Sequence, residues 1–172
     1  MIKNIEVKAI SYNNSNIRRI LRSKGADYKG KDHQVDTYFK FDNGRLKLRR
    51  GNIENALIHY KDISGPKQSN VLITPFDPKN FVLDELFNEL FGILVVVNKE
   101  REIYFIGNVK FHLDNVKDLG EFVEIEAMDN NGTIERKKRL EQCKFYSKLF
   151  GIEKKDLVSC SYSDLLLNKQ NE

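Results

Sequence analysis

Two glutamates late in the chain have the spacing of a metal-binding pair. Glu124 and Glu126 flank Ile125. Residues two apart on a β-strand point to the same face, which would place these two side chains about 7 Å apart. Such carboxylates repel each other unless they spread into solvent or a cation bridges them. Hard oxygen ligands of this kind suit Mg²⁺ or Mn²⁺, ions that share their ligands with substrate phosphates.

Cationic side chains recur with the same two-residue spacing on other segments. Arg45, Lys47 and Arg49 share one predicted strand face. Guanidinium groups offer bidentate contacts to phosphate, and ammonium groups act as point charges. The whole cationic set is Arg45, Lys47, Arg49, Lys61, Lys99, Arg101 and Lys110. An anion with several charges would need such a set.

The same alternation gives a charged face to the remaining strands. Asn4, Glu6 and Lys8 share a face on the first strand. On the next charged strand, His59 shares a face with Leu57 and Lys61, opposite Ile58 and Tyr60. Lys110 shares a face with His112 and Asp114. Glu124 shares a face with Glu126. Carboxylates therefore mark the first and last strands, and cations mark the strands between.

For each strand taken alone, a simpler explanation is that its charged face is exposed to solvent, because an antiparallel sheet often packs one face on a core and exposes the other. The sorting of charges by sign argues against it, since solvated faces tend to mix the two signs. The pattern favours a metal-assisted site for a polyphosphate, where positioning and electrostatics supply most of the rate.

The elements that must position these residues are mostly strands. We expect them at residues 2–10, 35–41, 45–49, 56–61, 71–74, 94–99, 102–106, 109–114 and 122–127. Asn43-Gly44 is a strong hairpin signal, and a loop with Gly65-Pro66 precedes residue 71. This predicts an α+β fold, mostly antiparallel, of about eight strands closed or nearly closed into a barrel.

Four helices are expected around the strands. The first ends at Gly25, the third spans 133–150 and the last spans 162–167. The second ends at Gly92 and has a predicted buried stripe of Val82, Leu83, Leu86, Phe87 and Leu90. No repeat or linker divides the chain, so residues 1–172 are predicted to form a single domain.

Composition narrows the class of protein. Of the 172 residues 40% are hydrophobic and 31% charged, which is typical of a globular chain, and a net charge of +4 is too weak to imply a polyanionic partner by itself. Two cysteines, Cys143 and Cys160, indicate a reduced compartment. Without an apolar leader or spanning run, we expect a cytoplasmic location and no membrane partner. The basic run 136–139 is interpreted as a solvated helix face, so nucleic acid is not expected. The oligomeric state stays open.

The charged motifs resemble those of the CYTH proteins, the triphosphate tunnel metalloenzymes. Asn4-Ile5-Glu6-Val7-Lys8 is similar to the N-terminal Glu-x-Glu-x-Lys signature of that family. Its class IV adenylate cyclase-like branch is similar, in order and spacing, at residues 33–39, 44–49, 57–61, 65–67, 109–114, 124–126 and 161–166. The resemblance covers nearly the whole chain. The family also includes thiamine triphosphatases and inorganic tripolyphosphatases.

The resemblance implies an eight-stranded tunnel barrel with a charged interior and flanking helices. It implies a divalent metal ion, Mg²⁺ or Mn²⁺, held by Glu6, Glu124 and Glu126 with Asp114 beside them, and with Asn4 at the first signature position. It assigns the triphosphate to Lys8, Arg45, Lys47, Arg49, Lys61, Lys99 and Arg101, with Lys110 on the face of Asp114. Lys61, with Tyr38, is the candidate for orienting or activating a nucleophilic water.

Asn4 departs from the signature, where the family has an acid. An amide oxygen can bind a metal ion but brings no charge, so metal affinity or the number of metal ions is expected to fall. Either the remaining carboxylates suffice, which is the interpretation adopted, or the chain binds triphosphates and turns them over poorly.

The leading functional hypothesis is hydrolysis of a small triphosphate, either inorganic tripolyphosphate or thiamine triphosphate. The close alternative is a class IV cyclase-like reaction that converts ATP to cyclic AMP and pyrophosphate. An alternative of another class is a non-catalytic binding module for triphosphates or polyphosphate. His33, His59 and His112 lie on separate segments without metal-ligand spacing and are interpreted as structural.

Overall fold

The computed structural model describes residues 2–61 and 68–170. The strands are β1 (Ile2–Ile10), β2 (Asp27–Phe39), β3 (Arg45–Arg50), β4 (Ala56–Tyr60), β5 (Gln68–Pro75), β6 (Ile93–Ile106), β7 (Val109–Val116) and β8 (Gly120–Asp129). The helices are α1 (Asn14–Ser23), α2 (Val82–Phe91), α3 (Arg136–Leu149) and α4 (Tyr162–Gln170), with a short 3₁₀ turn at Lys154–Asp156. The predicted Gly65-Pro66 loop and the 65–67 motif lie outside the described residues.

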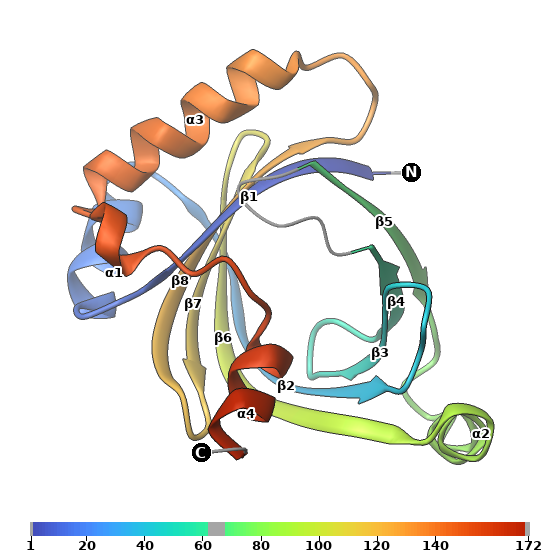
Figure 1. The fold of residues 1–172 in the computed structure, drawn as a ribbon. Helices are drawn as coiled ribbons and strands as arrows, with labels where there is room; N and C mark the ends of the chain where they lie inside the picture. The colour runs from blue at the N-terminus through green and yellow to red at the C-terminus, as the bar shows by residue number, and fades with distance from the viewer. Residues whose placement is uncertain (1, 62–67, 171–172) are drawn as a thin grey trace.

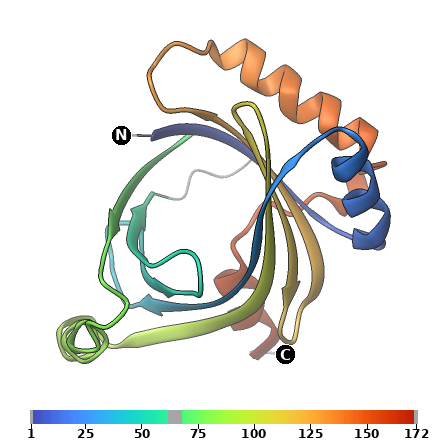
Figure 2. The same cartoon turned by 180° about the vertical axis from the view of Figure 1, so that it is seen from behind.

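Over the described residues, the eight strands pair in the order β1-β5-β4-β3-β2-β6-β7-β8, and the last pairs with the first. Every neighbouring pair is antiparallel. Figure 1 looks into this ring of strands, and Figure 2 shows it from behind. The predicted α+β fold, a mostly antiparallel barrel with flanking helices, is confirmed. None of the helices in the described part of the chain is long and apolar enough to cross a membrane.

Two strand predictions were wrong. β6 is one continuous strand where two were expected, and β2 begins at Asp27, not at residue 35. The cause is that the two strands pair with each other along most of their length, from Asp27 opposite Phe105 to Phe39 opposite Ile93. This pairing satisfies the backbone of polar stretches that carry little hydrophobic signal.

The main hydrophobic core lies outside the barrel wall. It contains Ile5, Phe111, Ile125 and Cys143, and α1 and α3 contribute to it. α3 runs across the outer face of β1 and β8, as Figure 1 shows. Because the apolar side chains of these strands point outward to the helices, the alternating charged side chains point into the barrel.

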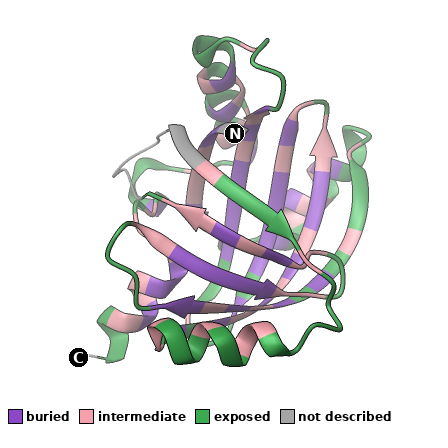
Figure 3. Ribbon diagram, turned by 90° about the vertical axis from the view of Figure 1, so that its right-hand side faces the viewer, coloured by how far each residue is buried: buried purple, intermediate pink, exposed green. Residues whose placement is uncertain are grey.

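The predicted buried stripe on α2 is a further correction. None of the described residues of α2 is buried, as Figure 3 shows on the side facing the viewer. Leu86 is 48% exposed and Leu90 62% exposed, whereas Leu83 and Phe87 pack partly against the cluster that contains Leu48. α2 sits at an outer corner between β5 and β6, so only a narrow edge of the helix reaches the barrel.

Alanine substitutions at two leucines, one buried and one exposed, test the placement of α2 against the barrel. Leu48→Ala is expected to lower the free energy of unfolding by about 2–5 kcal/mol, because it empties a buried position in the barrel wall. Leu86→Ala should cost less than about 1 kcal/mol, because that side chain is largely in water. Urea unfolding followed by circular dichroism measures both values. Equal losses would contradict the placement of α2.

Candidate functional site

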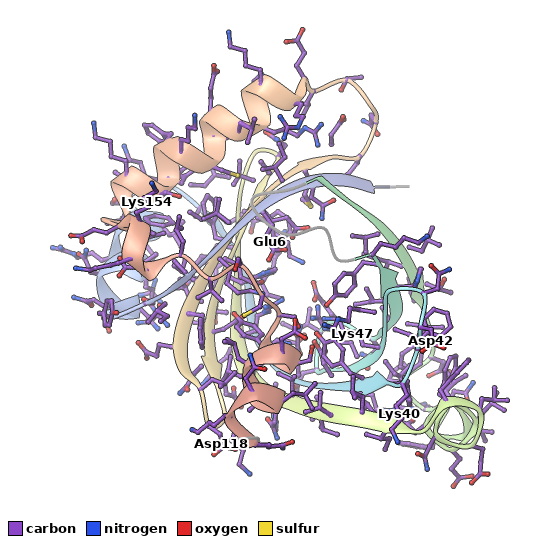
Figure 4. The ribbon with its side chains drawn as sticks, in the orientation of Figure 1. Glu6, Lys40, Asp42, Lys47, Asp118 and Lys154 are labelled. Carbon is purple, nitrogen blue, oxygen red and sulfur yellow. The ribbon has the colours of Figure 1, made fainter. Side chains whose placement is uncertain are left out.

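A cavity of about 1340 Å³ occupies the barrel interior and continues past the strands to α3 and to the segment between α3 and α4. The predicted cations that line it are Lys8, Lys47, Arg49, Lys61, Lys99, Arg101 and Lys110. The predicted oxygen donors that line it are Asn4, Glu6, Glu124 and Glu126, and Tyr38 also faces it. Figure 4 shows Glu6 and Lys47 inside the ring of strands, whereas Lys40, Asp42, Asp118 and Lys154 lie outside it. The structure thus brings most of the predicted site residues together.

One buried carboxylate organises the cationic wall. Asp36, on β2, accepts a hydrogen bond from Lys47 Nζ at 2.9 Å and from Lys99 Nζ at 2.8 Å. It also accepts two from Arg49, at 2.8 Å to Nε and 2.9 Å to Nη2. Burial raises the pKa of Asp36, but Arg49, Lys47 and Lys99 outweigh burial and hold it well below its usual range. Asp36 is therefore ionised and fixes three cations in place.

Three cations surround Asp36, and this wall keeps excess positive charge even though Arg49 also pairs with Glu54. Lys99 shows the consequence, because its side chain is 1% exposed and lies among other cations. Burial lowers the pKa of Lys99 to about 7, with Arg49, Arg101 and Lys47 adding to the effect against Asp36. A bound anion would relieve this repulsion and favour the charged ammonium.

Arg101 joins the cationic wall to the acidic one. Its Nε and Nη2 atoms donate to Asp114 at 2.7 and 2.5 Å, and Nη2 also donates to Glu124 at 2.8 Å. Asp114 accepts a further bond from Tyr162 Oη at 2.7 Å and is fully buried. Asp114, predicted beside the metal ion, is therefore occupied in holding Arg101.

The carboxylates gather where β1 pairs with β8. Glu6 lies opposite Glu126, and Lys8 lies opposite Glu124. Lys8 Nζ is 3.3 Å from Glu124 Oε1. Burial raises the pKa of Glu6 to about 7, and Glu124 adds to this more than Lys8 takes away. Burial also raises the pKa of Glu126. For Glu124, Arg101 and Lys8 outweigh burial and lower the pKa well below its usual range. Lys8, whose Nζ atom lies 3.8 Å from Glu6 Oε1, and Lys110 therefore compensate Glu6 and Glu126 only in part.

These oxygen donors fit a hard divalent cation in their chemistry. Asn4 Nδ2 donates to Glu126, and Asn4 Oδ1 is buried without a hydrogen-bond partner. An orphaned amide oxygen beside two under-compensated carboxylates is the kind of set that Mg²⁺ or Mn²⁺ prefers. Among the described residues, no three His, Cys, Asp or Glu side chains are already grouped to hold a metal ion. The donors would have to converge on it.

The face prediction for β4 was wrong. Ile58 and Tyr60 line the cavity, whereas His59 Nε2 contacts the carbonyl oxygen of Asn43 at 2.7 Å. The cause is the register with β3, in which Lys47 lies opposite Ile58 and both therefore share the inner face. Lys61 follows the last residue of β4, is exposed and lies at the edge of the cavity.

Two predicted residues take partners at the margins of the site. Arg45 pairs with Asp164 on α4, so this helix reaches the cationic set. Tyr38 is buried, and its hydroxyl accepts from Lys47 Nζ at 3.3 Å. Burial and the neighbouring Asp36 raise the pKa of Tyr38, so the phenol keeps its proton at neutral pH.

Three residues of this site had no binding or catalytic role predicted from the sequence. Asp36 alternates with Tyr38 on β2, and this spacing could have placed it inside the barrel. His112 shares a face with Lys110, but it was interpreted as structural. Its Nδ1 atom contacts Glu124 at 2.8 Å, and burial, aided by Arg101, lowers its pKa to about 4. Glu54 comes from a loop, where no periodicity points to it.

Comparison with known proteins agrees with this geometry. The family model for the CYTH domain matches residues 3–161. The chain therefore belongs to the CYTH domain family. A comparison with curated protein sequences finds no match.

Solved structures share the fold. The PH1012 protein of Pyrococcus horikoshii OT3 is 27% identical with a TM-score of 0.78, over 94% of this chain and 98% of that one. A candidate adenylate cyclase from Vibrio parahaemolyticus is 17% identical with a TM-score of 0.72, over 96% and 98%. A Hippeastrum protein, a candidate adenylyl cyclase described as having a dominant triphosphatase activity, is 14% identical with a TM-score of 0.63, over 100% and 97%. The last two likenesses bear on the fold alone.

Asp36→Asn tests the central contact. Removing the carboxylate charge leaves three buried cations poorly compensated, so the free energy of unfolding should fall by about 3–5 kcal/mol. Asp42→Asn, an exposed position of the same residue type, should change it by less than about 0.5 kcal/mol. Urea unfolding at neutral pH measures both. A loss at Asp36 no larger than at Asp42 would contradict the role of this carboxylate.

The same variant has a predicted pH dependence. Because the folded-state pKa of Asp36 is depressed, its contribution is fully present above the unfolded-state value of about 4 and is lost as the pH falls through the folded-state value. Below pH of about 4, the wild-type protein should therefore lose stability more steeply than Asp36→Asn. If the free energies of unfolding of the two proteins fall in parallel as the pH is lowered, the three cations do not lower the pKa of Asp36.

Proposed function

We propose that this CYTH protein is a divalent-metal-dependent hydrolase of a small triphosphate, such as inorganic tripolyphosphate or thiamine triphosphate. The observation that carries the proposal is the division of one cavity into two walls. One wall carries the cations fixed by Asp36, and the other carries the under-compensated Glu6 and Glu126. A triphosphate with a bound divalent ion presents both signs of charge and matches both walls.

Each wall has a distinct part in the reaction. Lys47, Lys99 and Arg101 would neutralise the phosphate oxygens, and Glu6, Glu124 and Glu126 with Asn4 would hold the metal ion. When bound, the ion supplies charge neutralisation at phosphoryl oxygens. The positions of the fixed cations are set before substrate arrives, so little reorganisation is needed in the transition state.

The remaining groups would orient the attacking water. Water attacks the terminal phosphorus, the phosphoanhydride bond breaks, and the diphosphate departs with the electron pair of that bond. Tyr38 keeps its proton and can donate a hydrogen bond to a phosphate oxygen or to the water. Lys61, at the edge of the cavity, is the candidate for holding the water in line.

Product analysis tests this function. Purified protein is incubated with tripolyphosphate, thiamine triphosphate or ATP and with Mg²⁺ or Mn²⁺, beside the folded double variant Glu124→Ala/Glu126→Ala. Orthophosphate release that the double variant abolishes is expected. Cyclic AMP with pyrophosphate would replace the proposal with the cyclase reaction. Tight binding without any product would replace it with the binding module.

Asn4→Asp tests the metal side without relying on turnover. The substitution places a third carboxylate beside Glu6 and Glu126. Without metal it should lower the melting temperature, because the protein loses the hydrogen bond that Asn4 Nδ2 donates to Glu126 and gains a like charge. With Mg²⁺ it should bind the ion about tenfold more tightly and show a larger Mg²⁺-induced rise in melting temperature. Asn131→Asp, an exposed control, should match wild type. An unchanged Mg²⁺ response would place the ion elsewhere.

A further inference from the structure

Glu54 contacts two cations from different walls of the cavity. Its Oε1 atom accepts from Lys110 Nζ at 2.6 Å, and its Oε2 atom accepts from Arg49 Nη1 at 2.9 Å. Arg49 lies on β3 and Lys110 on β7, which are separated by β2 and β6 in the ring of strands. Gln34 Nε2 also donates to Oε2, at 3.1 Å. One carboxylate therefore bridges two cations from strands that are not adjacent in the barrel.

The loop that carries Glu54 is held firmly. Asp32, fully buried on β2, accepts from the backbone nitrogens of Ile53 at 2.9 Å and Glu54 at 3.0 Å. A Cβ atom at Gly51 would approach the Asp32 carboxylate oxygens to 2.6 and 2.7 Å, so the loop passes this close only because residue 51 is glycine. In Figures 1 and 2 the connection between β3 and β4 bends into the ring of strands.

The Glu54 side chain is held in its ionised form as well as in its position. Burial raises the pKa of Glu54, but Lys110 and Arg49 outweigh burial and lower it. The carboxylate is therefore ionised at neutral pH. It neutralises Lys110, whose described ion pair is with Glu54, and shares Arg49 with Asp36. An approaching phosphate would meet a like charge here instead of two available cations.

We propose that Glu54 occupies the place of an additional phosphate group and so restricts the cavity to short phosphate chains. The proposal rests on the proposed triphosphate site, in which Lys47 and Lys99 contact Asp36 and Arg101 contacts Asp114. A chain longer than a triphosphate would have to displace Glu54 from both of its partners. Hydrogen bonds between charged groups are among the strongest in proteins, so breaking two of them costs enough free energy to select by chain length.

Glu54→Gln tests the proposal because it removes the charge and keeps the shape. Binding of tripolyphosphate and of long-chain inorganic polyphosphate is measured by calorimetry without metal, on folded protein. The ratio of long-chain to tripolyphosphate affinity should rise about tenfold or more. Glu121→Gln, the same change at an exposed position of β8, should leave the ratio unchanged. An unchanged ratio in Glu54→Gln, or an equal gain for both ligands, overturns the proposal.

A second variant separates the length restriction from a general gain in positive charge. Glu54→Gln/Lys110→Gln removes the acid and its cation together, so the ratio should return toward the wild-type value. A ratio that stays high would assign the gain to other cations and overturn the proposal. These experiments measure binding alone. A protein that does not hydrolyse triphosphates would contradict the proposed function, whereas the affinity ratio still tests the length restriction.

Discussion

Asp36 lies on the central one of three strands and holds cations from both neighbouring strands. Lys47 and Arg49 come from β3, and Lys99 comes from β6, and β2 lies between these two strands. Burying several like charges is costly unless they are paired. A single carboxylate keeps the cations in the interior but compensates them only in part. The depressed pKa of Lys99 reflects this remaining repulsion, which a polyanion would remove.

The acidic wall has the complementary imbalance. The register between β1 and β8 places Glu6 opposite Glu126, and their raised pKa values show that neighbouring cations do not offset their burial. Arg101 joins the two walls by donating to Asp114 and Glu124. The hydrophobic core lies between the barrel and its helices, so the interior is left to these charges. One ligand of mixed charge, the metal-bound polyphosphate proposed above, would relieve both imbalances.

Local patterns were enough to predict part of this arrangement. Alternation grouped Lys47 and Glu124 on the charged faces of their strands, because charged and apolar residues alternate within one strand. The family resemblance then implied that these faces point into the barrel. It failed where pairing between distant segments decides the outcome, as for Ile58 on β4 and for the continuous β6. Asp36 could not be recognised as the organising residue, because its partners depend on which strands flank β2. The closed barrel was implied by family resemblance, since alternation alone does not fix closure.

The most direct test of this account is a crystal structure with tripolyphosphate and Mn²⁺, with the ion located by its anomalous scattering. The account predicts phosphate groups against Lys47, Lys99 and Arg101, and Mn²⁺ between the phosphates and the Glu6–Glu126 side of the cavity. Phosphate on the outer surface, or Mn²⁺ bound away from Glu6 and Glu126, would contradict it.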